Sequence, residues 1–214
     1  MRICAVVIAA LVGACSSTGS EGQEELSDLT SEVRKLSTEL ETGKADLQNT
    51  LAEHDLIVNN TDGDWVGHYK KYCKGIEKVE KDRDGIRERV QKVKDAAKPY
   101  FARWKDENGK ITDQGLRERD AKNMEATRAR YEEIHKKGDE AKAAYEPLMV
   151  TLKDHRQFWA NNLNATSAAE MKKDAEALDK NAKALYGLID KVVETARKYN
   201  ESVAMRTTKA AAQP

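Results

Sequence analysis

The sequence is poor in the residues that would support a disulfide framework or a large aromatic core. Only three of its 214 residues are cysteines and only three are prolines, and aromatic residues make up 6%. We expect Cys4 to be removed and Cys15 to be modified, for reasons given below, which leaves Cys73 as a lone thiol. An internal disulfide is therefore excluded in the mature chain, and Cys73 is expected to be a small core residue.

Charge of a single sign is also missing. Lys and Arg number 37 and Asp and Glu number 37, so the formal net charge is zero. This balance gives no electrostatic basis for binding nucleic acid or an anionic membrane surface, and no nucleic-acid partner is expected. Charged residues make up 35% and hydrophobic residues 39%, a composition that also occurs in disordered chains. The regular spacing of the apolar residues, described below, argues against disorder.

The longest apolar run, residues 3–12, lies near the N-terminus after Arg2. It has the length of a secretory signal and is shorter than the ~20 residues of a membrane-spanning helix. The run ends in Val12-Gly13-Ala14-Cys15, which resembles a lipobox, the motif at which a diacylglycerol is attached to a cysteine before cleavage. We therefore predict a lipoprotein signal peptide over residues 1–14 and lipidation, with palmitate-type acyl chains, at Cys15.

Several acyl chains on Cys15 would hold the chain stably in a bilayer, which is its first expected partner. Ser16 follows the cysteine where an Asp would favour retention in the inner membrane, so we expect anchoring at the inner face of the outer membrane, facing the periplasm. Residues 15–23 are predicted to be the lipidated Cys and a flexible Ser/Gly-rich tether.

Beyond residue 23, apolar residues recur in steps of three and four, and strand-like alternation is missing. Such a repeat keeps one stripe of each helix facing its partners and indicates left-handed coiled-coil packing. The stripe has weak positions at Gly43 and Thr50, and its members in the second and third segments include Arg83 and Gly138. Its main members are Leu26, Leu29, Val33, Leu36, Leu40 and Leu47, then Tyr72, Ile76, Val79, Ile86, Val90 and Val93, then Tyr131, Ile134, Ala141, Leu148, Leu152, His155 and Trp159, and finally Ala168, Met171, Leu178, Leu185, Ile189, Val192 and Tyr199.

We predict an all-α fold of long antiparallel helices with heptad packing, in an elongated bundle of three or four helices. A heptad helix is expected over 24–58, the long antiparallel bundle over 62–206 and a disordered tail over 207–214. Asp62 or Asp64 is expected to cap the second helix, Thr112 or Asp113 the third, and Ser167 to open the fourth in a capping box with Glu170. Pro99 and Pro147 are expected to kink helices without dividing them.

The helix over 24–58 has two possible roles. Cys15 followed by a polar linker and a Leu zipper resembles the major murein lipoprotein, which would imply a coiled-coil oligomer. The resemblance covers only residues 15 to about 51, and the chain ends in Ala-Ala-Gln-Pro without the C-terminal Lys of that protein. Alternatively, the helix folds back as the fourth helix of its own bundle.

Residues 66–200 resemble a family of uncharacterised bacterial proteins known as domain of unknown function 2959. The resemblance rests on the spacing of several short stretches, since each alone is weak: Phe101-Ala-Arg-Trp104, Leu116-Arg-Glu-Arg-Asp120, Thr127-Arg-Ala-Arg-Tyr131, Glu146-Pro-Leu-Met-Val150, Leu152-Lys-Asp154 and Asn162-Leu-Asn-Ala165. It implies a helical envelope protein that is often lipidated, and it offers no catalytic residues to carry over.

The residues themselves give no catalytic constellation, so no enzyme activity, metal or cofactor is expected. The four histidines lack the helical spacing of a metal site, and His155 is expected to be a hydrogen-bonded core residue. Aromatic residues gather at one end of the expected rod, where they either close the bundle or form an interaction patch; the candidates are Trp65, Tyr69, Phe158 and Trp159.

The expected function is that of a membrane-tethered periplasmic lipoprotein, a non-catalytic structural spacer or scaffold of the cell envelope. This role predicts self-association or an envelope protein partner. The alternative is a binding module for a hydrophobic ligand, peptidoglycan or an envelope protein, which predicts a pocket near Pro99 or Pro147.

Overall fold

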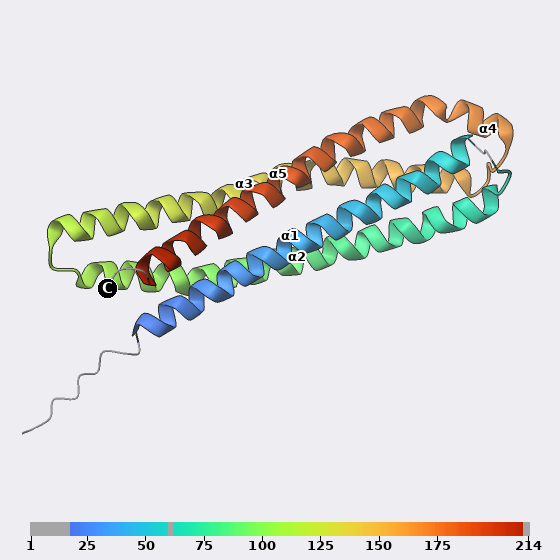
Figure 1. Ribbon diagram of the computed structural model, residues 1–214. Coiled ribbons are helices and arrows are strands. Elements are labelled where there is room, and N and C mark those ends of the chain that lie inside the picture. Colours follow the sequence, from blue (N-terminus) through green and yellow to red (C-terminus); the bar gives the residue numbers. More distant parts are fainter. Residues whose placement is uncertain (1–17, 60–61, 212–214) are drawn as a thin grey trace, which may run out of the picture.

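The computed structural model describes residues 18–59 and 62–211, which form five α-helices and no strand. The helices are α1 (Thr18–Asn59), α2 (Trp65–Lys110), α3 (Gln114–Trp159), α4 (Ala165–Glu170) and α5 (Lys172–Ala211). The four long helices run alternately up and down in an elongated bundle, and α4 is a short connection at one end (Figure 1). This arrangement confirms the predicted all-α class with long antiparallel helices.

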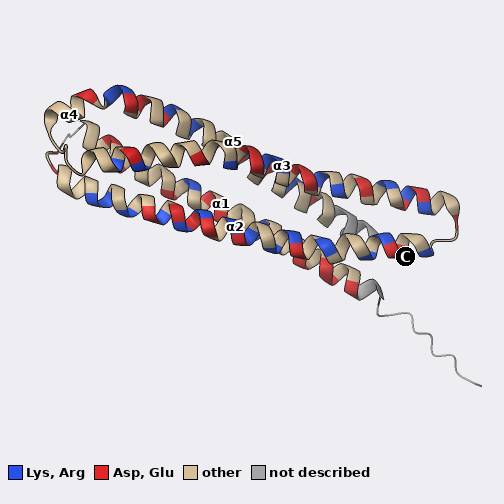
Figure 2. Cartoon of the chain, turned by 180° about the vertical axis from the view of Figure 1, so that it is seen from behind, with Lys and Arg blue, Asp and Glu red and all other residues tan. Residues whose placement is uncertain are grey.

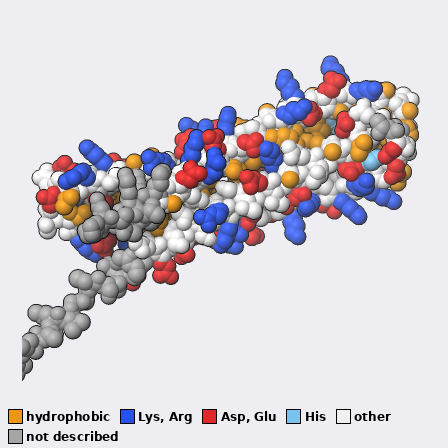
Figure 3. Space-filling view, viewed as in Figure 1, with side chains coloured by type: hydrophobic (Ala, Val, Ile, Leu, Met, Phe, Trp, Pro, Cys, Tyr) orange, Lys and Arg blue, Asp and Glu red, His pale blue; other side chains and the backbone are white. Residues whose placement is uncertain are grey.

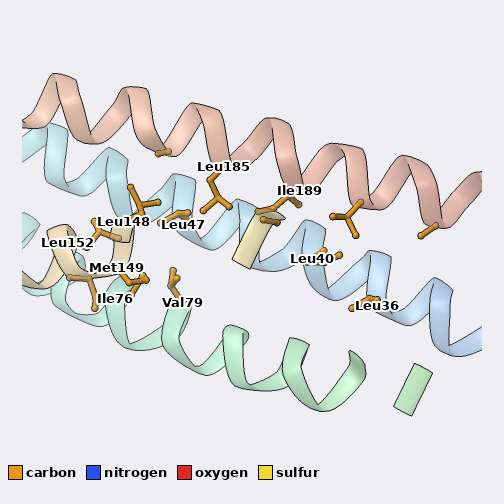
Figure 4. Close-up of a cluster of buried hydrophobic side chains, with 14 of the residues drawn as sticks. Leu36, Leu40, Leu47, Ile76, Val79, Leu148, Met149, Leu152, Leu185 and Ile189 are labelled. Atoms are coloured by element: carbon orange, nitrogen blue, oxygen red, sulfur yellow. The ribbon is translucent and has the colours of Figure 1, made fainter. Parts of the chain in front are cut away.

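The predicted apolar stripes form the core. Leu29, Val33 and Leu36 of α1 are almost fully buried, as are Leu178, Leu185 and Val192 of α5. Figure 4 shows core side chains that point toward the interior of the bundle, and those labelled are Leu36, Leu40, Leu47, Ile76, Val79, Leu148, Met149, Leu152, Leu185 and Ile189. Burial of this stripe, and not local propensity, gives such long helices most of their stability.

The first heptad helix belongs to its own bundle. α1 packs along α2 and α5, and its leucines share one core with those of the other helices (Figure 1). The stripe that would form an intermolecular zipper is therefore covered within the chain. Of the two roles left open by the sequence, the structure shows the bundle helix.

Two predicted boundaries are wrong. The flexible tether was expected to reach residue 23, but α1 begins at Thr18. Its first turns are held by Arg103 of α2, whose guanidinium pairs with Glu21 at 2.7 Å and with Glu25 at 2.8 Å. Likewise α5 extends to Ala211, past the predicted start of a disordered tail at residue 207, whereas residues 212–214 lie outside the described part.

The helix ends follow from local chemistry. The side chain of Asp64 accepts a hydrogen bond from the Gly67 N–H and that of Asp113 accepts one from Leu116, so two of the predicted caps are confirmed. The predicted capping box at Ser167 is wrong, because Asn164 is the cap and its side chain accepts from the Ser167 N–H. The helices continue through Pro99 and Pro147, as expected.

The bundle has two distinct ends. The start of α1, the turn between α2 and α3, and the end of α5 lie together, and we call this the proximal end (Figure 1). The end of α1, the start of α2, the end of α3, and α4 lie at the opposite, distal end. No described helix is both long enough and apolar enough to cross a membrane.

Residues of both charge signs are spread over the rod in the views of Figures 2 and 3, although α1 holds ten acidic and only three basic residues. Ion pairs join neighbouring helices, among them Arg89 of α2 with Glu32 of α1 at 2.6 Å and Lys44 of α1 with Asp190 of α5 at 2.6 Å. These ion pairs therefore link neighbouring helices side by side. Most of the exposed pairs add little to the free energy of unfolding.

Candidate functional site

The aromatic residues singled out from the sequence meet at the distal end. The Trp65 indole donates a hydrogen bond to the Ile57 carbonyl at 3.0 Å, and the Tyr69 hydroxyl donates one to the Arg156 carbonyl at 3.3 Å. Trp159 is 0% exposed and its ring lies 5.2 Å from that of Phe158. Trp159 therefore closes the core and offers no surface to a partner.

Trp65, Tyr69 and Phe158 are half-buried and remain candidates for an interaction patch. Val66 stands beside them with 55% of its surface exposed. Cys15, the predicted lipidation site, lies outside the described residues.

Behind the aromatic residues lies a buried pair of histidines. Nδ1 of His155 and Nε2 of His54 are 3.1 Å apart, and the two rings stack with centroids 5.0 Å apart. The expectation of a hydrogen-bonded core histidine at position 155 is thus confirmed. Its partner His54 was not predicted, although His54 continues the same 3-4 spacing four residues after Thr50 and three before Ile57.

The pair is uncharged at neutral pH. Burial, and next the neighbouring His155, lower the pKa of His54 to about 3, and burial also lowers the pKa of His155. Tyr72 packs against His54 with ring centroids 5.1 Å apart and donates a hydrogen bond to the Leu152 carbonyl at 2.7 Å. Both imidazoles are therefore packed into the core of the distal end.

A third histidine is partnered differently. The ring of His68 hydrogen bonds to Glu53 at 2.6 Å and to Asp62 at 2.9 Å, and these two carboxylates raise its pKa. The contacts join the end of α1 to the start of α2. In the described ranges no group of three or more His, Cys, Asp or Glu side chains is placed to hold a metal ion.

Two carboxyl groups face each other across the middle of the α1–α2 contact. Asp46 is 9% exposed and pairs with Lys78 at 2.7 Å. Burial, and next the Asp46 carboxyl, raise the pKa of Asp82. One oxygen of each carboxyl is buried without a hydrogen-bond partner among the described residues. The fold thus holds the two carboxyl groups together beside Lys78.

An opening toward the core lies in the middle of the bundle. A partly enclosed cavity of about 350 Å³ is bounded by all four long helices. Six of its apolar lining residues are labelled in Figure 4: Leu36, Leu40, Leu47, Val79, Leu185 and Ile189. Its rim includes Lys94 and His135, and it reaches Glu146, next to Pro147. The cavity is therefore placed near one of the two prolines named by the binding-module alternative.

A second, more open groove of about 400 Å³ continues from Lys94 toward the proximal end, between α2 and α3. Aromatic side chains Phe101 and Tyr131 form part of its wall, and the Arg128 guanidinium lies 5.0 Å above the Phe101 ring. Lys98, next to Pro99, and Lys105 also line it. The structure thus contains an apolar cavity and a cationic groove that share one lysine.

Comparison with known proteins identifies the chain through its family. Residues 16–203 match the family described as "Protein of unknown function (DUF2959)", and the chain belongs to it. No curated protein and no solved structure matches. The family assignment confirms the resemblance found in the sequence, whereas the resemblance to murein lipoprotein is not confirmed.

Proposed function

We propose that this member of the family is a lipid-anchored, non-catalytic spacer of the bacterial cell envelope. In this proposal Cys15 attaches the chain to the inner face of the outer membrane, and the bundle extends into the periplasm. The observation that carries it is the length of the bundle of four mutually packed helices, the first of which starts close to the predicted anchor. Helices of 42 and 46 residues span about 60–70 Å at 1.5 Å per residue.

The orientation follows from the position of the anchor. Only Ser16 and Ser17 separate Cys15 from the start of α1, so the proximal end lies next to the membrane. The distal end, with Trp65, Tyr69 and Val66 partly or largely exposed, then lies farthest from it. Aromatic residues beside exposed apolar ones are typical of protein contact surfaces. A second envelope protein is the partner that this end suits best.

The ion pairs between neighbouring helices support a rigid rod, as a spacer requires. Arg89 and Arg103 join α1 to α2, and the Lys153–Glu80 pair joins α3 to α2 at 2.5 Å. Because α1 is covered by α2 and α5, the proposal does not need an intermolecular zipper. The spacer is therefore expected to be a monomer of about 24 kDa before lipidation.

Site-specific photocrosslinking in cells tests this proposal with a matched pair of positions. Val66 at the distal end and Leu116 at the proximal end are 55% and 52% exposed, so both tolerate a photoreactive residue. The spacer predicts a discrete protein crosslink from position 66, no such product from position 116, and loss of the distal product in Cys15→Ala. The proposal is contradicted if Cys15→Ala leaves the protein in the outer-membrane fraction, or if only position 116 reaches a protein.

A further inference from the structure

The central cavity is a space that the side chains of this chain leave empty. A Cβ atom added at Gly138 would meet no atom within 4 Å outside its own helix, and one added at Gly43 would meet only side-chain atoms of Ile86 and Asp82, at 3.4 Å and 3.5 Å. Both glycines line the cavity, together with Ile86 and Val90 of α2. The lining atoms of an apolar void lack packing partners, which an apolar ligand would supply.

The cavity has the dimensions of one acyl chain. Its lining runs from Leu36 to Leu47 on α1 and from Ile134 to Glu146 on α3, which corresponds to about 16–18 Å along the bundle at 1.5 Å per residue. A single acyl chain spans one leaflet, or about 15 Å of a ~30 Å hydrocarbon core. The volume of about 350 Å³ is at the lower end of ligand pockets, which favours one chain over two.

The adjoining groove differs from the cavity in the state of its charges. On the cavity rim, Arg87 pairs with Glu146 and Lys44 with Asp190. In the groove, none of the four cations forms an ion pair with any carboxylate in the described part of the chain; they are Lys94, Lys98, Lys105 and Arg128. Glu132 is the one acidic residue of the groove lining. The groove therefore carries an excess of positive charge on a protein with none overall.

The junction of the two spaces carries an unsatisfied polar group. His135 lines the cavity next to Lys94, and its Nε2 is buried without a hydrogen-bond partner among the described residues. Burial, and next the charge of Lys94, lower its pKa, so the imidazole is neutral. A neutral imidazole at this point can accept or donate one hydrogen bond to a hydroxyl group between an apolar tail and a charged head.

We propose that the cavity and groove together bind a lysophospholipid with an anionic head: the single acyl chain fills the cavity, the free glycerol hydroxyl meets His135, and the phosphate lies among the groove cations. The guanidinium fork of Arg128 suits a phosphate, and the lysines add compact charges around it. A groove of about 400 Å³ has room for a glycerophosphate and is larger than a lone carboxylate needs. This proposal depends on neither the lipid anchor nor a distal partner.

Equilibrium dialysis tests the tail site. The protein is the full chain with Cys15→Ser, and the probe is palmitoyl-lysophosphatidylglycerol below its micelle concentration. One equivalent is expected to bind. Gly138→Leu fills the cavity and is expected to weaken binding at least tenfold, whereas Gly187→Leu, an exposed position on α5 with equally open surroundings, leaves it unchanged. Equal affinity of the two folded variants would overturn the proposal.

The head site is tested first by changing the ligand of the protein with an intact groove and then by changing groove lysines, so the result does not depend on how the leucine variants fold. Monopalmitoylglycerol, which lacks the phosphate, and palmitate are each expected to bind at least tenfold more weakly than the lysolipid. Lys98→Gln with Lys105→Gln is expected to weaken lysolipid binding about tenfold, and the exposed pair Lys70→Gln with Lys92→Gln to leave it unchanged. Binding of monopalmitoylglycerol or palmitate as tight as that of the lysolipid, or equal effects of the two lysine pairs, would overturn the phosphate assignment.

Discussion

α2 presents one face to α1 and another to α3, and the two contacts are built differently. Toward α1, Gly75 allows an approach so close that an added Cβ would lie 3.0 Å from Cβ of Thr50, and Arg89 pairs with two α1 carboxylates. Toward α3, the helices meet closely at the distal end and then border the cavity and the groove. We call the first contact the α1–α2 seam and the second the α2–α3 groove side.

The difference originates in three positions of the heptad stripe. Gly43, Arg83 and Gly138 occupy core-facing positions of three helices, and all three line the same cavity. Two glycines add no side-chain volume, and the half-buried Arg83 extends its charged end to Asp84 at the surface. A single weak position would be covered by its neighbours, but three at one height leave a cavity. The regular heptad positions therefore hold the helices together. The cavity lies where three exceptions to the heptad pattern fall at the same height along the bundle.

The largest expected effect comes from protonating the closed distal end. The folded pKa of His54, about 3, is below the unfolded value of 6.5, so the unfolded state binds more protons between these values. Stability is fully present above pH 6.5 and falls as the pH drops toward 3. Between pH 6.5 and pH 5 the loss is expected to reach about 2 kcal/mol, at 1.36 kcal/mol per pH unit. Urea unfolding across this range measures it, with His54→Leu/His155→Leu as the control whose stability should vary less with pH. Equal slopes for the two proteins would refute the buried pair.

The next prediction compares the α1–α2 seam with the α2–α3 groove side by adding one methyl group to a glycine on each. Gly75→Ala forces α1 and α2 apart and is expected to lower the free energy of unfolding by about 1–3 kcal/mol, the usual range for overpacking. Gly138→Ala, placed against the cavity, is expected to raise it by about 0.5–1 kcal/mol, because alanine favours the helix. Chemical denaturation of both variants checks the opposite signs. A stabilised Gly75→Ala would show that the seam is looser than described.

The smallest effect concerns the ion pairs of the two sides. Arg89 is 18% exposed and contacts Glu32 and Glu39 of α1, whereas Arg87 is 54% exposed and contacts Glu146 of α3 at 3.3 Å. Removing Arg89 is expected to cost about 1 kcal/mol and removing Arg87 less than about 0.5 kcal/mol. Unfolding of Arg89→Ala and Arg87→Ala in low and in 1 M salt measures both values. The difference should shrink in high salt, and a larger loss for Arg87→Ala would reverse the ranking of the two sides.

The sequence predicted the elements of the fold better than their association. The 3-4 spacing located the core of every long helix, and Asp64 and Asp113 marked two helix starts. It left the role of α1 open, since a leucine stripe suits a partner helix from the same chain or from another. The tether was misjudged because Ser and Gly favour flexibility locally, whereas the Glu21 and Glu25 contacts with Arg103 arise only in the folded bundle.

The candidate site was harder to predict, because it depends on contacts between distant segments. His155 was expected in the core, yet its neighbour His54 lies 101 positions away in the sequence. The distal aromatic residues were brought together as expected, but the full burial of Trp159 depends on the whole distal end. The only sign of the cavity in the sequence was that Gly43, Arg83 and Gly138 stand at stripe positions where a large apolar residue is expected. Their common height along the bundle becomes visible once the helices are in register.

The most direct test of this account asks whether α1 contacts α2 of the same chain at Gly75. In a full chain with Cys4→Ser, Cys15→Ser and Cys73→Ser, the pair Thr50→Cys and Gly75→Cys places two Cβ atoms about 3.0 Å apart, which is closer than in disulfides. A separation of the two helices by roughly 0.5–1 Å, which the overpacking at Gly75 itself favours, brings the pair into the ~3.5–4.5 Å range of disulfides. We expect rapid oxidation of this pair to an internally crosslinked monomer, while Thr50→Cys paired with Gly138→Cys stays reduced. Disulfide-linked dimers, or equal oxidation of the two pairs, would show that α1 associates between chains or that the seam does not exist.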